Sequence, residues 1–370
     1  MKHSTVTPLD GAEHRLMTIR TDMKAKNIDA LLVTHLPSIR YITNFSGSNA
    51  SLFILKSKVL FFTDDRYTEQ VKSELHAIKG LETYIERDPY KYAMDKNLLK
   101  GVLKLGADTG KVDYDTIVKL RKMFRPATIT KANGIVQNAT IPKTPDEVAK
   151  IRRAADIQAN VFNQILPLIK VGVSEQDLAA EITYRGRMLG AEKEAFDIIV
   201  VAGEHSAWVH GRATQQKIKK GDMITFDFGF YYEGFASDVT RTVAVGAVSK
   251  EQRKVYDIVR HAHGTAIAAA KAGMTGKELD AVARDIITTA GYGDYFKHSL
   301  GHGLGIEVHE NPGISFRNEK GRIPVGAVIT IEPGIYLPGK FGVRIEDDIL
   351  ITETGCEVLS SGSSELIIVE

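Results

Sequence analysis

The stretch Gly221-Asp-Met-Ile-Thr-Phe-Asp-Phe-Gly229 decides the fold, because a similar stretch, Gly326-Ala-Val-Ile-Thr-Ile-Glu-Pro-Gly334, follows it at an offset of 105 residues. A second pair of strings, Lys170–Leu178 and Lys271–Leu279, shares the pattern K-x-G-x-[ST]-x-x-[DE]-L at an offset of 101 residues. The glycine in this pattern ends one helix, and the serine or threonine caps the next. Two matches in the same order at nearly one offset predict a domain of two similar halves, each of helix–helix–strand design, related by an approximate twofold axis.

The chain before this repeat predicts a smaller α/β domain. Short apolar runs bounded by polar turns are typical of strands, and three of them occur at Ala30–Val33, Leu52–Leu55 and Val59–Phe62. A polar stretch then leads to a helix start at which Thr144 caps and Pro145 suits the first turn. We therefore expect a boundary near 135, with a first domain over residues 1–135 and the repeat-containing domain over residues 136–370. The fold class expected for the chain is α/β (α+β).

The composition is that of an ordinary globular protein, since 43% of the 370 residues are hydrophobic and 25% are charged. The net charge of +2 gives no electrostatic argument for binding nucleic acid or an anionic membrane. No apolar run reaches the roughly 18–20 residues of a membrane-spanning helix, and the N-terminus lacks the apolar stretch of a secretory signal. The single cysteine, Cys356, excludes an internal disulfide and a cysteine-based zinc site. We therefore expect a cytoplasmic protein that binds neither nucleic acid nor membranes.

The repeat places an acid at the end of an equivalent apolar run in each half, Asp227 in the first and Glu332 in the second. Each is followed at hairpin spacing by a strand with a further acid, Asp238 or Glu346, so each pair of acids can meet side by side. Four buried carboxylates would repel each other unless they were paired or bound to metal. Two divalent cations would balance the four negative charges, and His302 would add a neutral ligand. Mixed carboxylate and imidazole ligands suit Mn²⁺, Co²⁺, Fe²⁺ or Zn²⁺ better than Ca²⁺ or Mg²⁺.

Two alternatives are open at this point. The acids could be solvated at strand ends, or they could form ion pairs with Arg241 and Arg344. His298 and His302 have the i, i+4 spacing of a zinc-binding helix. However, the glycines around them disfavour a helix, since each costs about 1 kcal/mol relative to alanine, and they indicate a backbone that approaches a site closely. These glycines are Gly301, Gly303 and Gly305.

Further motifs surround these acids and are similar to those of one family. They are Ala207-Trp-Val-His-Gly211, Thr225-Phe-Asp-Phe-Gly229, Ser237-Asp-Val-Thr-Arg-Thr242, His298-Ser-Leu-Gly-His-Gly-Leu-Gly305, Val308-His-Glu-Asn-Pro312, Ile331-Glu-Pro-Gly334 and Arg344-Ile-Glu-Asp347. With them the chain resembles the pita-bread metallopeptidases, which include aminopeptidase P, prolidase, methionine aminopeptidase and the metal-free creatinase. The string Ile39-Arg-Tyr-Ile-Thr-Asn-Phe-Ser-Gly47 resembles the creatinase-type N-terminal domain. The resemblance implies a creatinase-type domain followed by a pita-bread catalytic domain.

The resemblance also implies a role for each matching residue. The metal ligands would be Asp227, Asp238, His302, Glu332 and Glu346. The residues that bind substrate or stabilise the intermediate would be His210, His298 and His309, with Arg344 and Tyr336 as a supporting pair and Phe196 in the pocket for the proline ring. The alternative for Phe196 is a position in the core. Because all five ligands are present, the resemblance implies two divalent metal ions, Mn²⁺ first and Co²⁺ or Zn²⁺ as alternatives, and it implies a homodimer.

The implied reaction is metal-dependent hydrolysis of the bond between an N-terminal residue and a following proline, with a proline-containing peptide as the partner and Glu332 taking the proton of water. Many prolidases carry an arginine four residues after the position of His309, where it can hold the carboxylate of a dipeptide. This chain has Gly313 there, so the expected activity is that of an Xaa-Pro aminopeptidase. The alternative is an Xaa-Pro dipeptidase (prolidase), in which Arg317 could serve instead. A more remote alternative, a non-catalytic binding protein of the same fold, is disfavoured because no ligand is missing.

Overall fold

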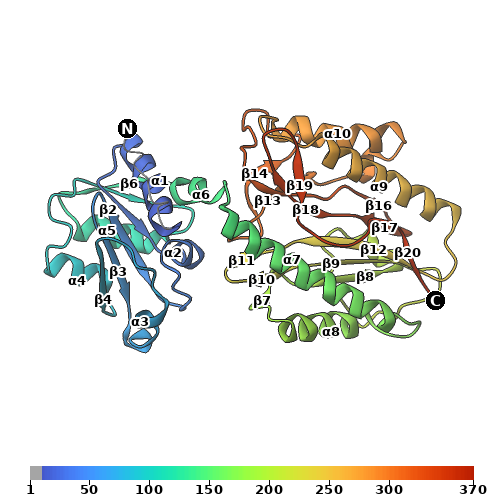
Figure 1. Cartoon of the computed structure of the whole chain (residues 1–370), viewed down its shortest axis with the longest axis horizontal. Helices are drawn as coiled ribbons and strands as arrows, with labels where there is room; N and C mark the ends of the chain where they lie inside the picture. Colours follow the sequence, from blue (N-terminus) through green and yellow to red (C-terminus); the bar gives the residue numbers. More distant parts are fainter. Residues whose placement is uncertain (1–10) are drawn as a thin grey trace, which may run out of the picture. The chain divides into compact units, whose positions relative to one another are not determined.

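The computed structural model describes residues 11–370 and divides into two compact units, of which one ends at Thr140 and the other runs from Ile141 to Glu370 (Figure 1). The first unit has a six-stranded sheet of order β4-β3-β2-β1-β5-β6, in which β1 pairs antiparallel with β2 and parallel with β5. Its strands are β1 (Ala30–Val33), β2 (Ser51–Leu55), β3 (Val59–Thr63), β4 (Leu81–Ile85), β5 (Lys104–Ala107) and β6 (Thr128–Lys131). Its helices are α1 (Gly11–Ala25), α2 (Leu36–Thr43), η1 (Asp65–Tyr67), α3 (Gln70–Glu74), α4 (Pro89–Asp95), α5 (Tyr114–Met123) and α6 (Ile135–Thr140).

The three strands expected from short apolar runs are present as β1, β2 and β3, so that prediction is confirmed. All three are almost entirely buried, which explains why their sequences are continuous apolar runs rather than alternating ones. The last helix of this unit, α6, packs against α1. In addition, the hydroxyl of Tyr41 donates a hydrogen bond to the carbonyl of Ala139 at 2.8 Å. These contacts keep the chain through Thr140 with the first unit, and the division follows α6.

The second unit combines two larger sheets with a small sheet and a hairpin. The larger sheets have the orders β20-β12-β9-β8 and β14-β13-β15-β18-β19, and the smaller groups are β11-β10-β7 and β16-β17. The strands are β7 (Lys193–Glu194), β8 (Ile199–Ala202), β9 (Met223–Phe228), β10 (Phe230–Tyr232), β11 (Phe235–Ala236), β12 (Val239–Val245), β13 (Gly301–Gly303), β14 (Glu310–Ile314), β15 (Val328–Ile331), β16 (Gly334–Leu337), β17 (Phe341–Arg344), β18 (Asp347–Ile351), β19 (Cys356–Val358) and β20 (Ile367–Val369). The helices are α7 (Pro145–Ile165), η2 (Leu166–Leu168), α8 (Glu175–Met188), η3 (Gly203–Ala207), α9 (Lys250–Ala269), α10 (Gly276–Thr289) and η4 (Gly293–Tyr295).

The two halves of this unit repeat each other in local detail. Each half contains a glycine in the left-handed region, Gly172 at φ 93° and Gly273 at φ 85°. Each glycine donates its N–H at 2.9 Å to an isoleucine carbonyl, that of Ile218 in the first half and that of Ile323 in the second. A capping box then starts the following helix, α8 or α10. These pairs have the same offsets, 101 and 105 residues, as the sequence repeat, so the predicted repeat is confirmed.

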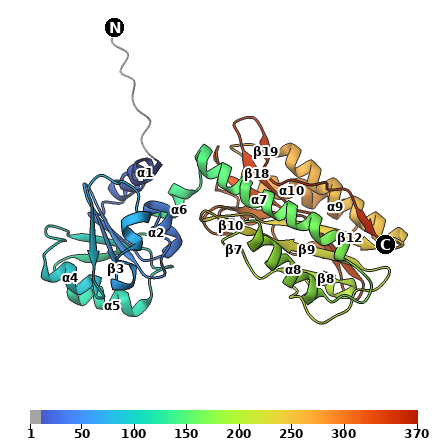
Figure 2. The same cartoon turned by 60° about the horizontal axis from the view of Figure 1, so that its bottom comes forward.

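The helices cover the sheets half by half. Helices α7 and α8 lie beside strands of the first half, and α9 and α10 lie beside strands of the second, as both views show (Figures 1 and 2). None of the helices within residues 11–370 combines the length and the apolar character needed to span a bilayer.

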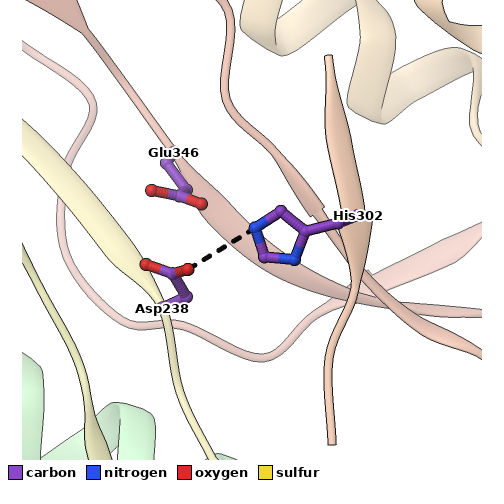
Figure 3. A group of neighbouring side chains, drawn as sticks. All are labelled: Asp238, His302 and Glu346. Carbon is purple, nitrogen blue, oxygen red and sulfur yellow. Dashed lines mark ion pairs between the residues drawn. The ribbon is translucent and has the colours of Figure 1, made fainter. Parts of the chain in front are cut away.

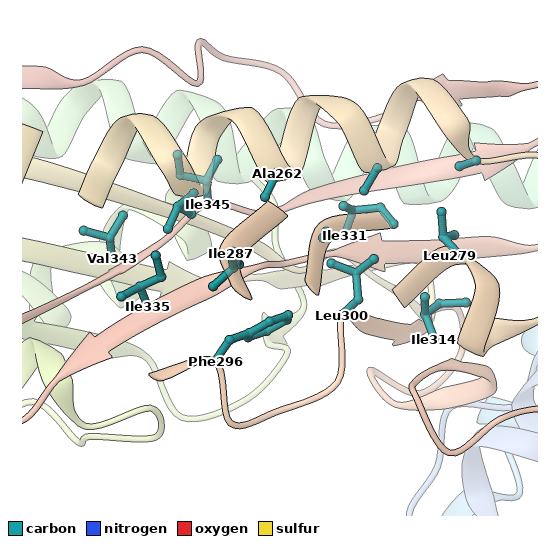
Figure 4. Close-up of a cluster of buried hydrophobic side chains, with 14 of the residues drawn as sticks. Ala262, Leu279, Ile287, Phe296, Leu300, Ile314, Ile331, Ile335, Val343 and Ile345 are labelled. Carbon is teal, nitrogen blue, oxygen red and sulfur yellow. The ribbon is translucent and has the colours of Figure 1, made fainter. Parts of the chain in front are cut away.

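The apolar core fixes the direction in which the acids point. Val343 and Ile345 are fully buried in a cluster to which α9 and α10 contribute (Figure 4). Arg344 and Glu346 alternate with them and line a cavity instead. In β9, two fully buried phenylalanines flank Asp227 in the same way. Because each buried apolar side chain contributes about 1.5–3 kcal/mol, turning one of these strands over would be strongly unfavourable.

Candidate active site

Three potential metal ligands, one from the first half of the second unit and two from the other half, lie close together (Figure 3). Asp238 directly precedes β12, His302 lies in β13, and Glu346 lies between β17 and β18. One ligand atom from each of the three lies within 4.8 Å of the others. Asp238 Oδ2 is 3.6 Å from His302 Nε2. An ion with ligand distances of about 2.0–2.3 Å can bridge such separations.

Two further carboxylates complete the group. Glu332 follows β15, and its Oε1 is 3.5 Å from His302 Nε2. Asp227 in β9 accepts a hydrogen bond from Arg344 Nη2 through Oδ2 at 2.6 Å. Its other oxygen, Oδ1, is buried and has no hydrogen-bond partner among the described residues. A buried oxygen left unsatisfied costs about 1–3 kcal/mol, and a bound cation would satisfy it.

Two antiparallel strand pairs bring the four acids together, as the hairpin spacing predicted. In the first, β9 pairs with β12 in a register that sets Asp227 opposite Thr240, two residues beyond Asp238. In the second, β15 pairs with β18 and sets Ile331 opposite Asp347, directly beside Glu332 and Glu346 in the sequence. The acids of each half therefore lie on neighbouring strands.

The carboxyl groups are strongly perturbed by this arrangement. Burial, followed by the charge of Glu346, raises the pKa of both Asp238 and Glu332 well above the usual range. Burial, followed by the charge of Asp227, raises the pKa of Glu346 to about 8. Divalent cations would reverse this effect by favouring the charged form of each acid. The donor set of four carboxylates and one imidazole, together with the unsatisfied oxygen of Asp227, therefore fits divalent metal ions.

His302 is held in the form that a metal ligand requires. Its Nδ1 lies 3.1 Å from the carbonyl oxygen of Gly303, so this nitrogen carries the proton and donates it. Nε2 then presents a lone pair toward Asp238 and Glu332. Burial, followed by the neighbouring His309, lowers the pKa of His302 to about 4, which keeps the ring neutral. A backbone carbonyl that fixes the tautomer of a ligating histidine is a common feature of metal sites.

A hydrogen-bond chain joins Asp227 to His298 through two buried side chains. Arg344 donates to Asp227 and, from Nη1, to the hydroxyl of Tyr336 at 2.8 Å. The Tyr336 hydroxyl lies 2.9 Å from His298 Nε2, and His298 Nδ1 lies 2.8 Å from the carbonyl of Ser299. These partners require Nδ1 to donate and Nε2 to accept. Burial, followed by the charge of Arg344, lowers the pKa of His298 to about 3 and keeps it neutral.

An open cavity of about 580 Å³ exposes this group to substrate-sized molecules. It is lined by all five predicted metal ligands and by five further predicted residues, His210, His298, His309, Arg344 and Phe196. His309 lies close to the ligands, since its ring centroid is 4.3 Å from that of His302. Burial lowers the pKa of His309. Phe196 is partly exposed and not in the core.

Two predicted residues lie outside the lining of this cavity. Tyr336 is only 3% exposed, and it reaches the site through its hydroxyl bonds to Arg344 and His298 rather than through a surface for substrate. Arg317 is exposed, and its guanidinium carbon lies 5.1 Å from the ring of Phe316. The cavity lining includes Gly313 and not Arg317.

The alternative that the acids are solvated at strand ends is wrong for Asp227, Asp238 and Glu346, which are buried, and Glu332 is half-buried. The alternative of ion pairs is correct for one acid, since Arg344 pairs with Asp227. Arg241 instead pairs with Asp347 at 2.7 Å, next to the candidate ligand Glu346.

Several residues that support the site were not identified from the sequence. Thr240 donates to Glu346 Oε2 at 2.6 Å, and the period of two along the strand from Asp238 could have indicated it. Asp280 in α10 accepts two hydrogen bonds from Arg284, which also donates to the carbonyl of His298 at 2.7 Å. The buried Asp280 thereby fixes the segment that carries His298, and no local pattern indicates this contact.

Comparisons with known proteins extend over both units. Residues 149–353 match the description Metallopeptidase family M24, and residues 15–139 match Creatinase/Prolidase N-terminal domain. The chain is 37% identical over 361 residues to a protein of Pyrococcus horikoshii named Xaa-Pro dipeptidase, which covers 97% of this chain and 100% of that protein.

Solved structures are similar over nearly the same length. An Xaa-Pro dipeptidase from Bacillus anthracis has a TM-score of 0.92 and 38% identity and covers 97% of this chain and 100% of that one. An X-Pro aminopeptidase from Thermotoga maritima has a TM-score of 0.87 and 36% identity and covers 94% of this chain and 100% of that one. The chain therefore belongs to metallopeptidase family M24, as a metal-dependent peptidase with the pita-bread fold in the Xaa-Pro branch of that family.

Proposed function

We propose that the protein is an Xaa-Pro dipeptidase, which releases proline from a dipeptide by hydrolysing the bond before it. The sequence favoured an Xaa-Pro aminopeptidase because of Gly313, but similarity over nearly the whole chain to proteins named Xaa-Pro dipeptidase supports the dipeptidase instead. The observation that carries the proposal is the cavity in which five potential metal ligands stand beside Phe196 and three histidines. An X-Pro aminopeptidase remains the second candidate, favoured by the absent side chain at Gly313 and by the structure from Thermotoga maritima.

We assign five residues to a pair of divalent metal ions, for which we propose Mn²⁺ with Co²⁺ or Zn²⁺ as alternatives. The residues are Asp227, Asp238, His302, Glu332 and Glu346. When bound, such ions lower the pKa of water and offset negative charge on the carbonyl oxygen under attack.

The remaining roles belong to side chains of this chain. Glu332 takes the proton of the attacking water, because its Oε1 faces the ligand group, 3.5 Å from His302 Nε2, and its hydrogen-bond contact with Thr330 is long, at 3.5 Å. His309 lies beside the ligands as a neutral ring, and we propose that its N–H stabilises the developing oxyanion. His210 and His298 orient the substrate, and Arg344 holds Asp227 in place.

Recognition of proline must use the shape of its ring, because proline has no backbone N–H once it is in a peptide bond. Phe196 offers a partly exposed aromatic surface in the cavity for this ring. We also propose a cytoplasmic homodimer, as the family resemblance implies; light scattering and cell fractionation would test the oligomer and the location.

The test of the proposed function compares three substrates with the metal-loaded protein. These are an Xaa-Pro dipeptide, the matching Xaa-Pro-Yaa tripeptide and an Xaa-Ala dipeptide as a control. A dipeptidase should give a kcat/KM for Xaa-Pro at least about tenfold above those for the other two. A higher kcat/KM for the tripeptide would favour the aminopeptidase over the dipeptidase. An equal kcat/KM for Xaa-Ala would show that the enzyme does not select for proline.

A further inference from the structure

The lining of the active-site cavity contains two arginines among the residues that the structure describes, and their surroundings differ sharply. Arg344 is only 3% exposed and is engaged by Asp227, Thr240 and Tyr336. The side chain of Arg212 is 82% exposed, and its Nη2 lies 2.9 Å from Oδ2 of Asp197, whose side chain is 75% exposed. An exposed ion pair of this kind contributes little to stability, because water and salt screen the two charges. The guanidinium of Arg212 can therefore leave Asp197 and bind another carboxylate with little loss of free energy.

The backbone that carries Arg212 is anchored on both sides by one buried acid. Glu175, at the start of α8, is fully buried, and its Oε1 lies 2.9 Å from His205 Nδ1. Its Oε2 accepts hydrogen bonds from the backbone N–H of Thr214 at 3.0 Å and from the Thr214 hydroxyl at 2.8 Å. The segment between these two contacts contains His210 and Arg212. Arg212 is therefore an exposed charged side chain on a loop that is anchored on both sides.

Gly211 holds the same loop against the body of the unit. A Cβ at this position would lie 2.9 Å from a methyl carbon of Val201 and 3.1 Å from His205 Nε2. The backbone at Gly211 thus packs directly on buried residues, one position before Arg212. This packing fixes where the Arg212 side chain leaves the backbone, at the edge of the cavity.

A dipeptide substrate carries a negative charge that a cation of the cavity lining can hold. Its carboxylate follows proline directly, and a guanidinium can bind such a group through two charge-assisted hydrogen bonds. Gly313 also lines the cavity and provides no side chain, and a Cβ there would meet nothing within 4 Å. Arg317 lies outside the lining.

We propose that Arg212 binds the C-terminal carboxylate of the Xaa-Pro substrate and so makes the site specific for dipeptides; this inference rests on the proposed dipeptidase function. Asp197 holds the guanidinium between turnovers and is replaced by the substrate carboxylate, which can form two parallel hydrogen bonds with the planar fork. In a longer peptide the same position is a neutral amide, and Arg212 then contributes little.

The test uses the metal-loaded enzyme with an Xaa-Pro dipeptide and its C-terminal amide, Xaa-Pro-NH₂, which differ only in the charge at this end. Arg212→Ala should raise KM for the acid by about fivefold and leave KM for the amide within about twofold, with kcat little changed. Arg212→Lys should recover part of the loss, since lysine keeps the charge without the fork. Arg317→Ala is the matched control and should change neither KM.

A second measurement is independent of turnover. Trp208, the single tryptophan of the chain, lies in the same loop and is 67% exposed, so its fluorescence can report binding of the dipeptide to the metal-free protein. Arg212→Ala should weaken this binding as much as it raises KM, whereas Asp197→Asn should not weaken it because it removes the competing carboxylate.

The outcomes separate this inference from the proposed function. If Arg212→Ala raises KM for acid and amide alike, or for neither, Arg212 does not bind the carboxylate, although the enzyme is still a dipeptidase. If the unmodified enzyme cleaves tripeptides and not Xaa-Pro, the proposed function fails, and the fluorescence titration then decides separately whether Arg212 binds a carboxylate. An unchanged melting temperature in each variant excludes loss of fold as the cause.

Discussion

Arg344 donates a hydrogen bond from Nη2 to Oδ2 of Asp227 at 2.6 Å, while Oδ1 of the same carboxylate is buried without a hydrogen-bond partner among residues 11–370. The pair therefore orients Asp227 by one oxygen and leaves the other available to a ligand. One buried arginine balances one of four carboxylates, so most of the negative charge of the site needs another source of compensation. Breaking such a buried pair typically costs about 3–5 kcal/mol, because it leaves a charge without its partner.

We expect Asp238→Ala and Glu346→Ala each to lower the metal content of the purified protein and to abolish hydrolysis of Xaa-Pro. Both residues lie within the group whose ligand atoms are within 4.8 Å of one another, so each loss removes a donor and a charge. Elemental analysis and a proline-release assay measure the two effects. The control is Glu357→Gln, which alters an exposed acid paired with Arg152. Full metal stoichiometry in either alanine variant would refute the assignment of ligands.

The melting temperature of the metal-free protein should fall as the pH rises. Burial raises the pKa of Glu346 from its ordinary 4.5 to about 8 in the folded state, so the folded protein retains a proton that the unfolded chain loses. This contribution to stability is complete below pH 4.5 and disappears as the pH rises through about 8. Between pH 6 and pH 9 we expect a decrease of about 5–10 °C in the presence of a chelator.

Divalent metal should abolish this pH dependence, because a bound cation favours the charged carboxylates. Scanning calorimetry with chelator and with Mn²⁺ at each pH provides the comparison. If the melting temperature in chelator does not change with pH, burial does not raise the pKa of these carboxyl groups.

His309→Ala should lower kcat by about 10²–10³-fold while the metal content stays unchanged. The ring of His309 lies 4.3 Å from that of His302, and we assign it to the oxyanion rather than to the metal. Metal analysis together with single-turnover kinetics distinguishes the two roles. His261→Ala, which removes an exposed histidine of α9, serves as the control, and loss of metal from the His309 variant would make it a ligand.

Lys143→Met should destabilise the protein by about 3–5 kcal/mol in denaturant unfolding. The side chains of Lys143 and Glu310 are 1% and 6% exposed, and Nζ lies 3.1 Å from Oε2. Removing the lysine leaves the buried carboxylate without this cation, whereas the double variant Lys143→Met with Glu310→Gln removes both charges and should lose less. If the free energy of unfolding falls equally in the two variants, the lysine stabilises the protein through packing of its stem and not through its charge.

Gly313→Arg should restore dipeptide affinity to the Arg212→Ala variant. A Cβ at position 313 meets no atom within 4 Å, and the position lines the cavity, so the new side chain has room. The measurement is KM for Xaa-Pro and for Xaa-Pro-NH₂ in the single and double variants. We expect the double variant to regain a low KM for Xaa-Pro and to keep its KM for Xaa-Pro-NH₂. A lower KM for both substrates would indicate a general effect on the loop.

The grouping of the candidate site residues could largely be predicted from the sequence, because the acids follow the strand period. Asp227 and Glu346 each alternate with buried apolar residues, and the repeat relates Asp227 to Glu332. The same rules predicted β1, β2 and β3 and the two capping boxes. In all these cases the information lies within a few residues or within one repeat.

The residues that could not be predicted act through contacts between distant segments. Glu175 looks like an ordinary acid in the first turn of a helix, yet it anchors a loop 30–39 residues further along the chain. Arg212 and Asp197 are unremarkable charged residues until the fold places both at one cavity. The choice between dipeptides and longer peptides could not be predicted either, because under the proposal it depends on Arg212, and no local pattern marks this residue as part of the cavity.

The origin of the acids in both halves of the repeat has a consequence for the lifetime of the protein in a cell. Under the proposed assignment, the ions bind only when the halves are docked, and ligands that bind only the native state shift the folding equilibrium toward it. When divalent metal is scarce, this stabilisation by binding is lost, and the opened state, which proteases attack, becomes more populated. Metal supply would then set the abundance of this peptidase as well as its turnover number, so that starved cells degrade the copies they cannot load.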